Sequence, residues 1–213
     1  MNPDKVKTVE IYGRKFQIYK MSAKASLKVI KILAAKVLPF LNIDGKFPET
    51  DNMDELLSII SLEKIADAIG HINGDDLEKL INYGLSHCYE KLTGGATQVL
   101  NSNGTYGVMG IENDMIFTLR LTIEVIAWSV SGIFRRKLLG FDVSGYGRHV
   151  QDECARFDEL HGVNFLFQPV IAGHWKHYET WDGTYDLDDL MDIVEVMQVQ
   201  AENKRRAGEQ AEI

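Results

Sequence analysis

The longest apolar segment of the chain covers residues 114–139. After its opening acid, only Arg120 and Glu124 carry a charge before the basic cluster at its end. Side chains four residues apart share one face of a helix and can form an ion pair. About 20 apolar residues can cross a bilayer, but each charge near the middle costs about 2.5–3.5 kcal/mol. The pattern therefore predicts a buried central helix of a soluble domain, capped by Asn113 or Asp114.

Apolar and polar residues alternate on both sides of Gly13. Val9 and Ile11 precede this glycine, and Phe16 and Ile18 follow it. Alternation with a period of two is typical of a strand that is buried on one face, and glycine readily adopts the positive φ of a tight turn. The segment predicts a short β-hairpin.

Apolar positions recur every three or four residues in six further segments, which predicts amphipathic helices. The last of these begins at Asp186, with Asp189 three residues later, a pairing typical of a helix N-terminus. The predicted helices cover 23–41, 53–69, 74–92, 148–160, 163–177 and the segment from 186 to the basic cluster at 204–206.

Two glycine-rich stretches interrupt the helical pattern. Residues 93–112 lack the Gly-Lys-Ser/Thr ending of a phosphate-binding loop and predict a connecting loop. Residues 140–147 predict a linker. The predicted fold is mainly α-helical (α+β), with a small N-terminal β-hairpin followed by a helical bundle, then a small helical C-terminal unit. The predicted domains are residues 1–140 and 148–213.

Charge narrows the class of partner. The formal net charge of −8 disfavours nucleic acid and anionic membranes. The charge is uneven, because residues 1–50 are basic whereas 51–90 and 148–213 are acidic, and this pattern favours protein partners or self-association. Two cysteines far apart in sequence and a polar N-terminus without an apolar segment behind it predict a cytoplasmic protein.

Motifs for catalysis are missing from the sequence. His174 and His177 are three residues apart and Asp186 follows, so a metal site is one hypothesis, although the third ligand has no fixed register. Packing of an aromatic helix end is the alternative. No Gly-x-Ser-x-Gly motif is present, and Cys154 lacks a motif that pairs it with a histidine. We expect no catalytic residues, no bound metal and no cofactor.

Two sets of side chains are candidates for binding a partner. One is a row of lysines on the predicted helix 23–41, and the other is a group of aromatic residues near the C-terminal unit. A solvated helix face is the alternative interpretation of the lysines, and core packing is the alternative for the aromatic residues. The candidates are Lys24, Lys28, Lys31, Trp175, Tyr178 and Trp181.

Two parts of the chain resemble proteins of long-tailed bacteriophages. The N-terminal segment KFQIYKMSAKASLKVIKIL is similar to the hairpin and first helix of phage tail assembly chaperones. Residues 167–206 resemble a small C-terminal module of these phages, with an apolar helix, an aromatic turn, an Asp-Gly-Thr segment and a final helix. The matching residues are Gly173, Tyr178, Asp182, Gly183, Thr184, Leu187, Asp188, Ala201, Glu202, Asn203 and Arg206.

The resemblance implies a non-enzymatic phage tail assembly chaperone, in a two-part form. Such a protein binds the long helical tape measure protein and recruits subunits of the major tail tube protein. It acts in the host bacterial cytoplasm and is not expected in the mature virion. Two alternatives stay open: a small metal-dependent hydrolase that uses His174, His177 and Asp186, and a phage-encoded regulator that binds a host protein.

Overall fold

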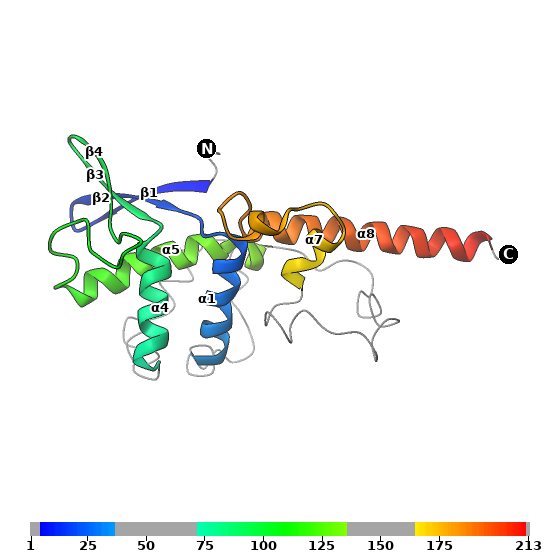
Figure 1. Cartoon of the computed structure of the whole chain (residues 1–213), viewed down its shortest axis with the longest axis horizontal. Helices are drawn as coiled ribbons and strands as arrows, with labels where there is room; N and C mark the ends of the chain where they lie inside the picture. Colours follow the sequence, from blue (N-terminus) through cyan, green and yellow to red (C-terminus); the bar gives the residue numbers. More distant parts are fainter. Residues whose placement is uncertain (1–4, 37–71, 136–164, 212–213) are drawn as a thin grey trace. The chain divides into compact units, whose positions relative to one another are not determined.

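The computed structural model describes residues 5–36, 72–135 and 165–211 (Figure 1). The chain divides into two compact units. The first unit contains Met1–Met21 and Ala25–Phe134, and the second contains Ser22–Lys24 and Arg135–Ile213. The predicted helices 53–69 and 148–160 and the predicted linker lie outside the described residues.

The first unit is built on a four-stranded antiparallel sheet with the strand order β1-β2-β3-β4. Its strands are β1 (Val6–Ile11), β2 (Arg14–Tyr19), β3 (Cys88–Leu92) and β4 (Gly95–Gln98). Tyr12 and Gly13 both have positive φ angles, 49° and 77°, as a two-residue hairpin turn requires. The predicted N-terminal hairpin is confirmed as β1 and β2.

The prediction of a hairpin followed by a helical bundle is wrong. The predicted helix 74–92 ends early, as α4 (Gly74–Leu85), and the chain then enters β3. Residues in β3 pair with the free side of β2, so that Ile18 lies opposite Cys88. Part of the predicted glycine-rich loop forms β4. The first unit is therefore a mixed α+β structure rather than a bundle with an added hairpin.

Helix α5 (Met115–Arg135) fills the role predicted for the central helix. Asp114 accepts a hydrogen bond from the Phe117 amide at 2.9 Å, which confirms it as the N-cap. Arg120 and Glu124 form the expected ion pair, with Nε and Oε1 3.6 Å apart. Lys7 of β1 also reaches Glu124, at 3.8 Å.

One core joins α5 to the sheet and to the neighbouring helices, α1 (Ala23–Lys36) and α4. By length and composition, residues 115–132 of α5 could also cross a membrane, but half of this window is buried inside the structure. The buried positions face the sheet and the helices, which is the pattern of a core helix in a soluble domain. The most deeply buried core side chains are Phe16, Ile18, Met21, Val29, Leu85, Val99, Ile111, Leu121 and Val125.

The second unit is built on the long helix α8 (Leu187–Ala211). Asp186 accepts hydrogen bonds from the Asp188 and Asp189 amides, and Asp189 accepts one from the Asp186 amide. This reciprocal capping confirms the predicted start of the helix. The predicted helix 163–177 is confirmed only in part, because the helical residues are η3 (Phe165–Phe167) and α7 (Gln168–Ile171). The chain then leaves the helix and forms the short 3-10 helix η4 (His177–Thr180).

Candidate functional site

The first unit exposes four large apolar side chains at one end. Tyr12 is 72% exposed, Met109 94%, Met115 59% and Ile116 70%. We call these four residues the apolar patch. Figure 1 shows the β1–β2 turn, the loop before α5 and the start of α5 at the same end of this unit. Exposed apolar groups of this size at one place are typical of a binding surface.

Two side chains hold the three segments of the patch together. The Phe117 ring lies 5.6 Å from the Tyr12 ring, and the Arg14 guanidinium lies 5.2 Å from the Phe117 ring. Arg14 also donates a hydrogen bond to the Met109 carbonyl, at 3.4 Å. The turn, the loop and the helix start are therefore fixed to each other beneath the exposed side chains.

Arg14 is itself held by a buried acid. Its Nε and Nη2 lie 2.7 and 2.9 Å from the two carboxylate oxygens of Glu90 on β3, and Glu90 is 6% exposed. The two parallel hydrogen bonds fix the plane of the guanidinium. The hydrogen bonds to Glu90 raise the pKa of Arg14 above its usual value. Arg14 therefore keeps its positive charge and holds the segments of the apolar patch in place.

The glycine-rich loop is ordered around two anchors. Val108 and Ile111 are buried in the core, and Met109 between them points outward. Gly107 lies so close to β4 that a Cβ there would clash with the Gln98 carbonyl oxygen, and its amide donates a hydrogen bond to the Val99 carbonyl. The prediction of a connecting loop holds for residues 99–114, which join β4 to α5, and buried residues and a close backbone approach fix the path of this loop.

The capped start of α5 explains why its first two residues are exposed. Met115 and Ile116 directly follow the Asp114 cap, whereas Phe117 and Leu121 turn inward to the core. The first turn of a helix can bury only the side that faces its neighbours, so two apolar residues remain in solvent. The sequence carried a signal for this patch: a methionine in a polar loop, and two apolar residues next to a cap.

The predicted lysine row is divided between the two units. Lys24 lies in the second unit, where its Nζ is 4.9 Å from the centre of the Trp181 ring. Lys28 and Lys31 are exposed on α1 in the first unit. The structure therefore places Lys24, but not the whole row, with one of the predicted aromatic residues. Partner binding by these residues stays a prediction.

The predicted aromatic residues have different environments. Trp175 is 6% exposed and stacks on Tyr185, with ring centres 4.3 Å apart, so it packs within the second unit. Tyr178 and Trp181 are 48% and 43% exposed. An exposed tryptophan with a lysine over its face is suited to a protein contact, because both groups keep a surface open to a partner.

Two residues of the hypothetical metal site, His177 and Asp186, have other contacts. His177 stacks on Phe167 and lies 4.4 Å from the Trp181 ring, and Asp186 caps α8. Within residues 5–36, 72–135 and 165–211, no group of three or more His, Cys, Asp or Glu side chains is placed to hold a metal ion. In the first unit, burial raises the pKa of the Cys88 thiol to about 12, so this cysteine is a poor nucleophile at neutral pH.

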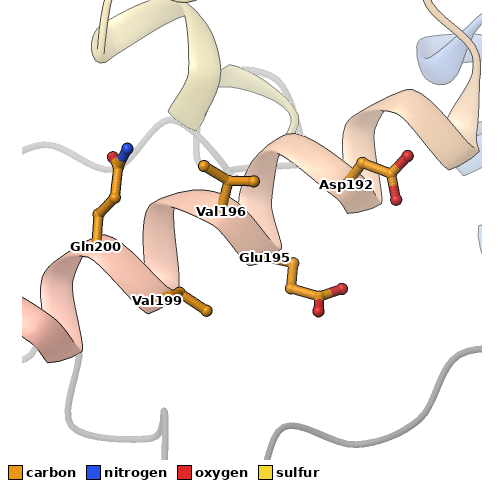
Figure 2. Close-up of a pocket in the computed structure, with 5 residues that line it drawn as sticks. All are labelled: Asp192, Glu195, Val196, Val199 and Gln200. Carbon is orange, nitrogen blue, oxygen red and sulfur yellow. The ribbon is translucent and has the colours of Figure 1, made fainter.

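A second exposed apolar surface lies on α8. Figure 2 shows five side chains that project from successive turns of this helix. These residues line a hollow of about 380 Å³. Val196 and Val199 are 48% and 36% exposed, whereas Leu187, Leu190 and Val194 are buried. The described residues that line the hollow are Asp192, Glu195, Val196, Val199 and Gln200.

A comparison with family models identifies the family of the chain. The model of a phage tail assembly chaperone protein matches residues 12–140, which include nearly the whole described first unit. The chain belongs to the phage tail assembly chaperone family. The resemblance to tail assembly chaperones is thereby confirmed, and the protein acts as a chaperone in bacteriophage tail assembly, where it interacts with tail proteins.

Other comparisons add little to this identification. A second family model, of a family of unknown function (DUF6889), matches residues 175–212. No curated protein and no solved structure matches the chain. Membership of a chaperone family indicates a non-enzymatic role.

Proposed function

We propose that the chain binds the tape measure protein through the apolar patch of its first unit and brings subunits of the major tail tube protein to it. The observation that carries this proposal is the exposure of Tyr12, Met109, Met115 and Ile116 at one rigid end of the unit that matches the chaperone family. The resemblance to tail chaperones implies a helical client with apolar stripes. Such a helix binds by laying its apolar side against an apolar surface of the partner.

The chemistry of the patch suits a long client with a varied sequence. Two of its four residues are methionines, whose flexible and polarisable side chains adapt to different apolar partners. The support beneath them is rigid, because Arg14 and Phe117 tie the three segments together. A rigidly held patch with flexible side chains can bind many positions along one tape measure protein. Several copies that each bind weakly to the same molecule gain affinity through multivalency.

Co-expression with the tape measure protein tests the proposal. Met109→Ser/Ile116→Ser removes two exposed side chains from the patch and leaves the core intact. Leu92→Ser is the matched control, because Leu92 is 50% exposed in the same unit, at the β3–β4 turn. We expect the tape measure protein to become insoluble with the double variant and to stay soluble with the control. A double variant that keeps it soluble as well as the natural chain would overturn the proposal.

The lysines and the aromatic residues provide two rival sets of binding residues, one in each unit, that the same assay tests. Lys24→Glu removes the cation over Trp181, and Trp181→Ala removes the ring. Lys28→Glu/Lys31→Glu changes charge on the exposed side of α1 alone. If the variants of one set no longer keep the tape measure protein soluble and the patch variant still does, the client binds at that set of residues instead.

The proposed site of action is the host bacterial cytoplasm during infection, because tails assemble where their subunits are made. We expect the protein to leave before the virion is complete. Mass spectrometry of purified virions checks this: peptides of the tube protein should be present and peptides of this chain should be absent. Peptides of this chain in amounts comparable to the tube protein would contradict a transient role.

A further inference from the structure

The apolar patch contains the two most exposed methionines among the residues that the structure describes. Met109 is 94% exposed and Met115 is 59% exposed, whereas Met21 is fully buried in the core. The other described methionines, Met191 and Met197, are only partly exposed on α8. A reagent in solution therefore reaches the two sulfur atoms of the patch more easily than those in the rest of the described chain.

An exposed methionine is open to oxidation by a peroxide. With hydrogen peroxide, the thioether sulfur loses two electrons and gains one oxygen atom, the O–O bond breaks, and the second oxygen leaves as water. The product is a sulfoxide, so a flexible apolar side chain becomes a polar one. The other two members of the patch, Tyr12 and Ile116, contain no sulfur. Oxidation therefore makes half of the side chains of the patch polar.

We propose that Met109 and Met115 are a modification site, and that their oxidation by a peroxide weakens the binding of the client to the apolar patch. The inference rests on the proposed function, since it concerns the regulation of the same surface. A client helix buries apolar side chains against the patch, and a sulfoxide there loses its water without gaining a hydrogen-bond donor. Methionine sulfoxide reductases return the sulfur to the thioether, so the modification is reversible.

The two side chains take no part in the hydrogen bonds that hold the patch together. The Met109 carbonyl, not the side chain, accepts the hydrogen bond from Arg14. The cap of α5 joins Asp114 to the Phe117 amide and does not involve the Met115 side chain. Oxidation of a buried methionine disrupts a core, but these two sulfur atoms lie outside it. We therefore expect the oxidised chain to stay folded and to lose only the binding surface.

Suppression of aggregation by the full chain tests the inference. The chain is treated with hydrogen peroxide, the peroxide is removed, and tape measure protein is diluted into it from urea while light scattering is recorded. The concentration of chain that halves the scattering should rise at least about ten-fold after treatment. For Met109→Leu/Met115→Leu, the ratio between treated and untreated protein should stay near one, whatever the starting level. Met191→Leu/Met197→Leu removes sulfur outside the patch and should stay as sensitive as the natural chain.

Two measurements on the treated natural chain check the chemistry. Mass spectrometry should show that Met109 and Met115 are oxidised before Met21, and methionine sulfoxide reductases should restore the suppression of aggregation. Circular dichroism should be unchanged. The inference is overturned if the chain with both residues oxidised suppresses aggregation as well as before, if it loses its helices, or if Met109→Leu/Met115→Leu becomes equally ineffective after treatment.

The untreated variant Met109→Ser/Ile116→Ser separates this inference from the proposed function. If this variant suppresses aggregation as well as the natural chain, the patch is not the binding surface, and the proposed function and the inference both fail. If the variant is ineffective but oxidation of the natural chain changes nothing, the proposed function stands and the inference alone fails.

Discussion

Removal of Arg14 should destabilise the first unit more than removal of any exposed cation. Arg14→Met keeps most of the side-chain volume over Phe16 and Phe117 and leaves Glu90 without its bidentate partner. Breaking a buried ion pair from one side costs about 3–5 kcal/mol. The Arg14 side chain is 31% exposed, so water reaches the vacated site and lowers the expected loss to about 2–3 kcal/mol.

A double-mutant cycle separates the ion pair from the rest of the site. Arg14→Met/Glu90→Leu removes both charges and should recover most of the loss, to within about 1 kcal/mol of the natural chain. Lys79→Met is the control, because Lys79 pairs with Asp76 at an exposed position and should cost less than about 1 kcal/mol.

Urea denaturation followed by tryptophan fluorescence measures these free energies, with Trp128 of α5 as the reporter in the first unit. The reasoning would be refuted if Arg14→Met cost no more than Lys79→Met. It would also be refuted if the two losses at Arg14 and Glu90 simply added in the double variant.

Three further variants test the packing, the protonation and the capping seen in the structure. Gly84→Ala should lower the free energy of unfolding by about 1–3 kcal/mol, because its Cβ would lie 2.9 Å from Thr122 Cγ2. In Gly74→Ala, in the same helix, the added Cβ meets no neighbouring atom and should not destabilise the protein. Equal melting temperatures of the two variants would contradict the close approach of α4 to α5. Burial lowers the pKa of His87, so the stability that neutral His87 contributes is complete above about pH 6.5 and is lost as the pH falls. This loss is at most about 1.4 kcal/mol per pH unit. In thermal melts between about pH 7.5 and 5.5, His87→Asn should show a smaller loss of stability than the natural chain. Asp186→Ala should cost about 0.5–2 kcal/mol in thermal melts because α8 loses its cap, while Asp186→Asn keeps an accepting oxygen and should cost less.

Features specified by nearby residues were predictable from the sequence. The β1–β2 turn follows from Gly13 and its alternating neighbours, and the starts of α5 and α8 follow from Asp114 and Asp186. Each of these features depends on hydrogen bonds or φ angles within about four residues of the signal. Local chemistry therefore sufficed to place them.

The second half of the sheet depends on a partner that is distant in sequence. The segment 88–92 has apolar residues at spacings that also fit a helix, and β2 decides its structure by pairing Phe16 with Glu90. The buried Glu90 is acceptable there only because Arg14, far away in the chain, neutralises it. Strand formation that rests on such tertiary contacts is not visible in local periodicity.

The candidate site was predicted only in part for the same reason. Lys24 and Trp181 were both named as candidate binding residues, but nothing in the sequence places the cation over the ring. The apolar patch combines a turn, a loop and a helix start that meet through Phe117 and Arg14. Sequence can mark Met109 or Ile116 as unusual, but only the fold shows that they share one end of the unit.

Hydrogen exchange on the complex with the tape measure protein tests the central claim most directly. The amides of the free chain and of the complex are compared peptide by peptide. We expect binding to slow exchange in the β1–β2 turn around Tyr12, in the loop at Met109 and in the first turn of α5, where the patch lies. Unchanged exchange in these three segments, with slowing confined to the segment from Trp175 to Trp181, would contradict the account.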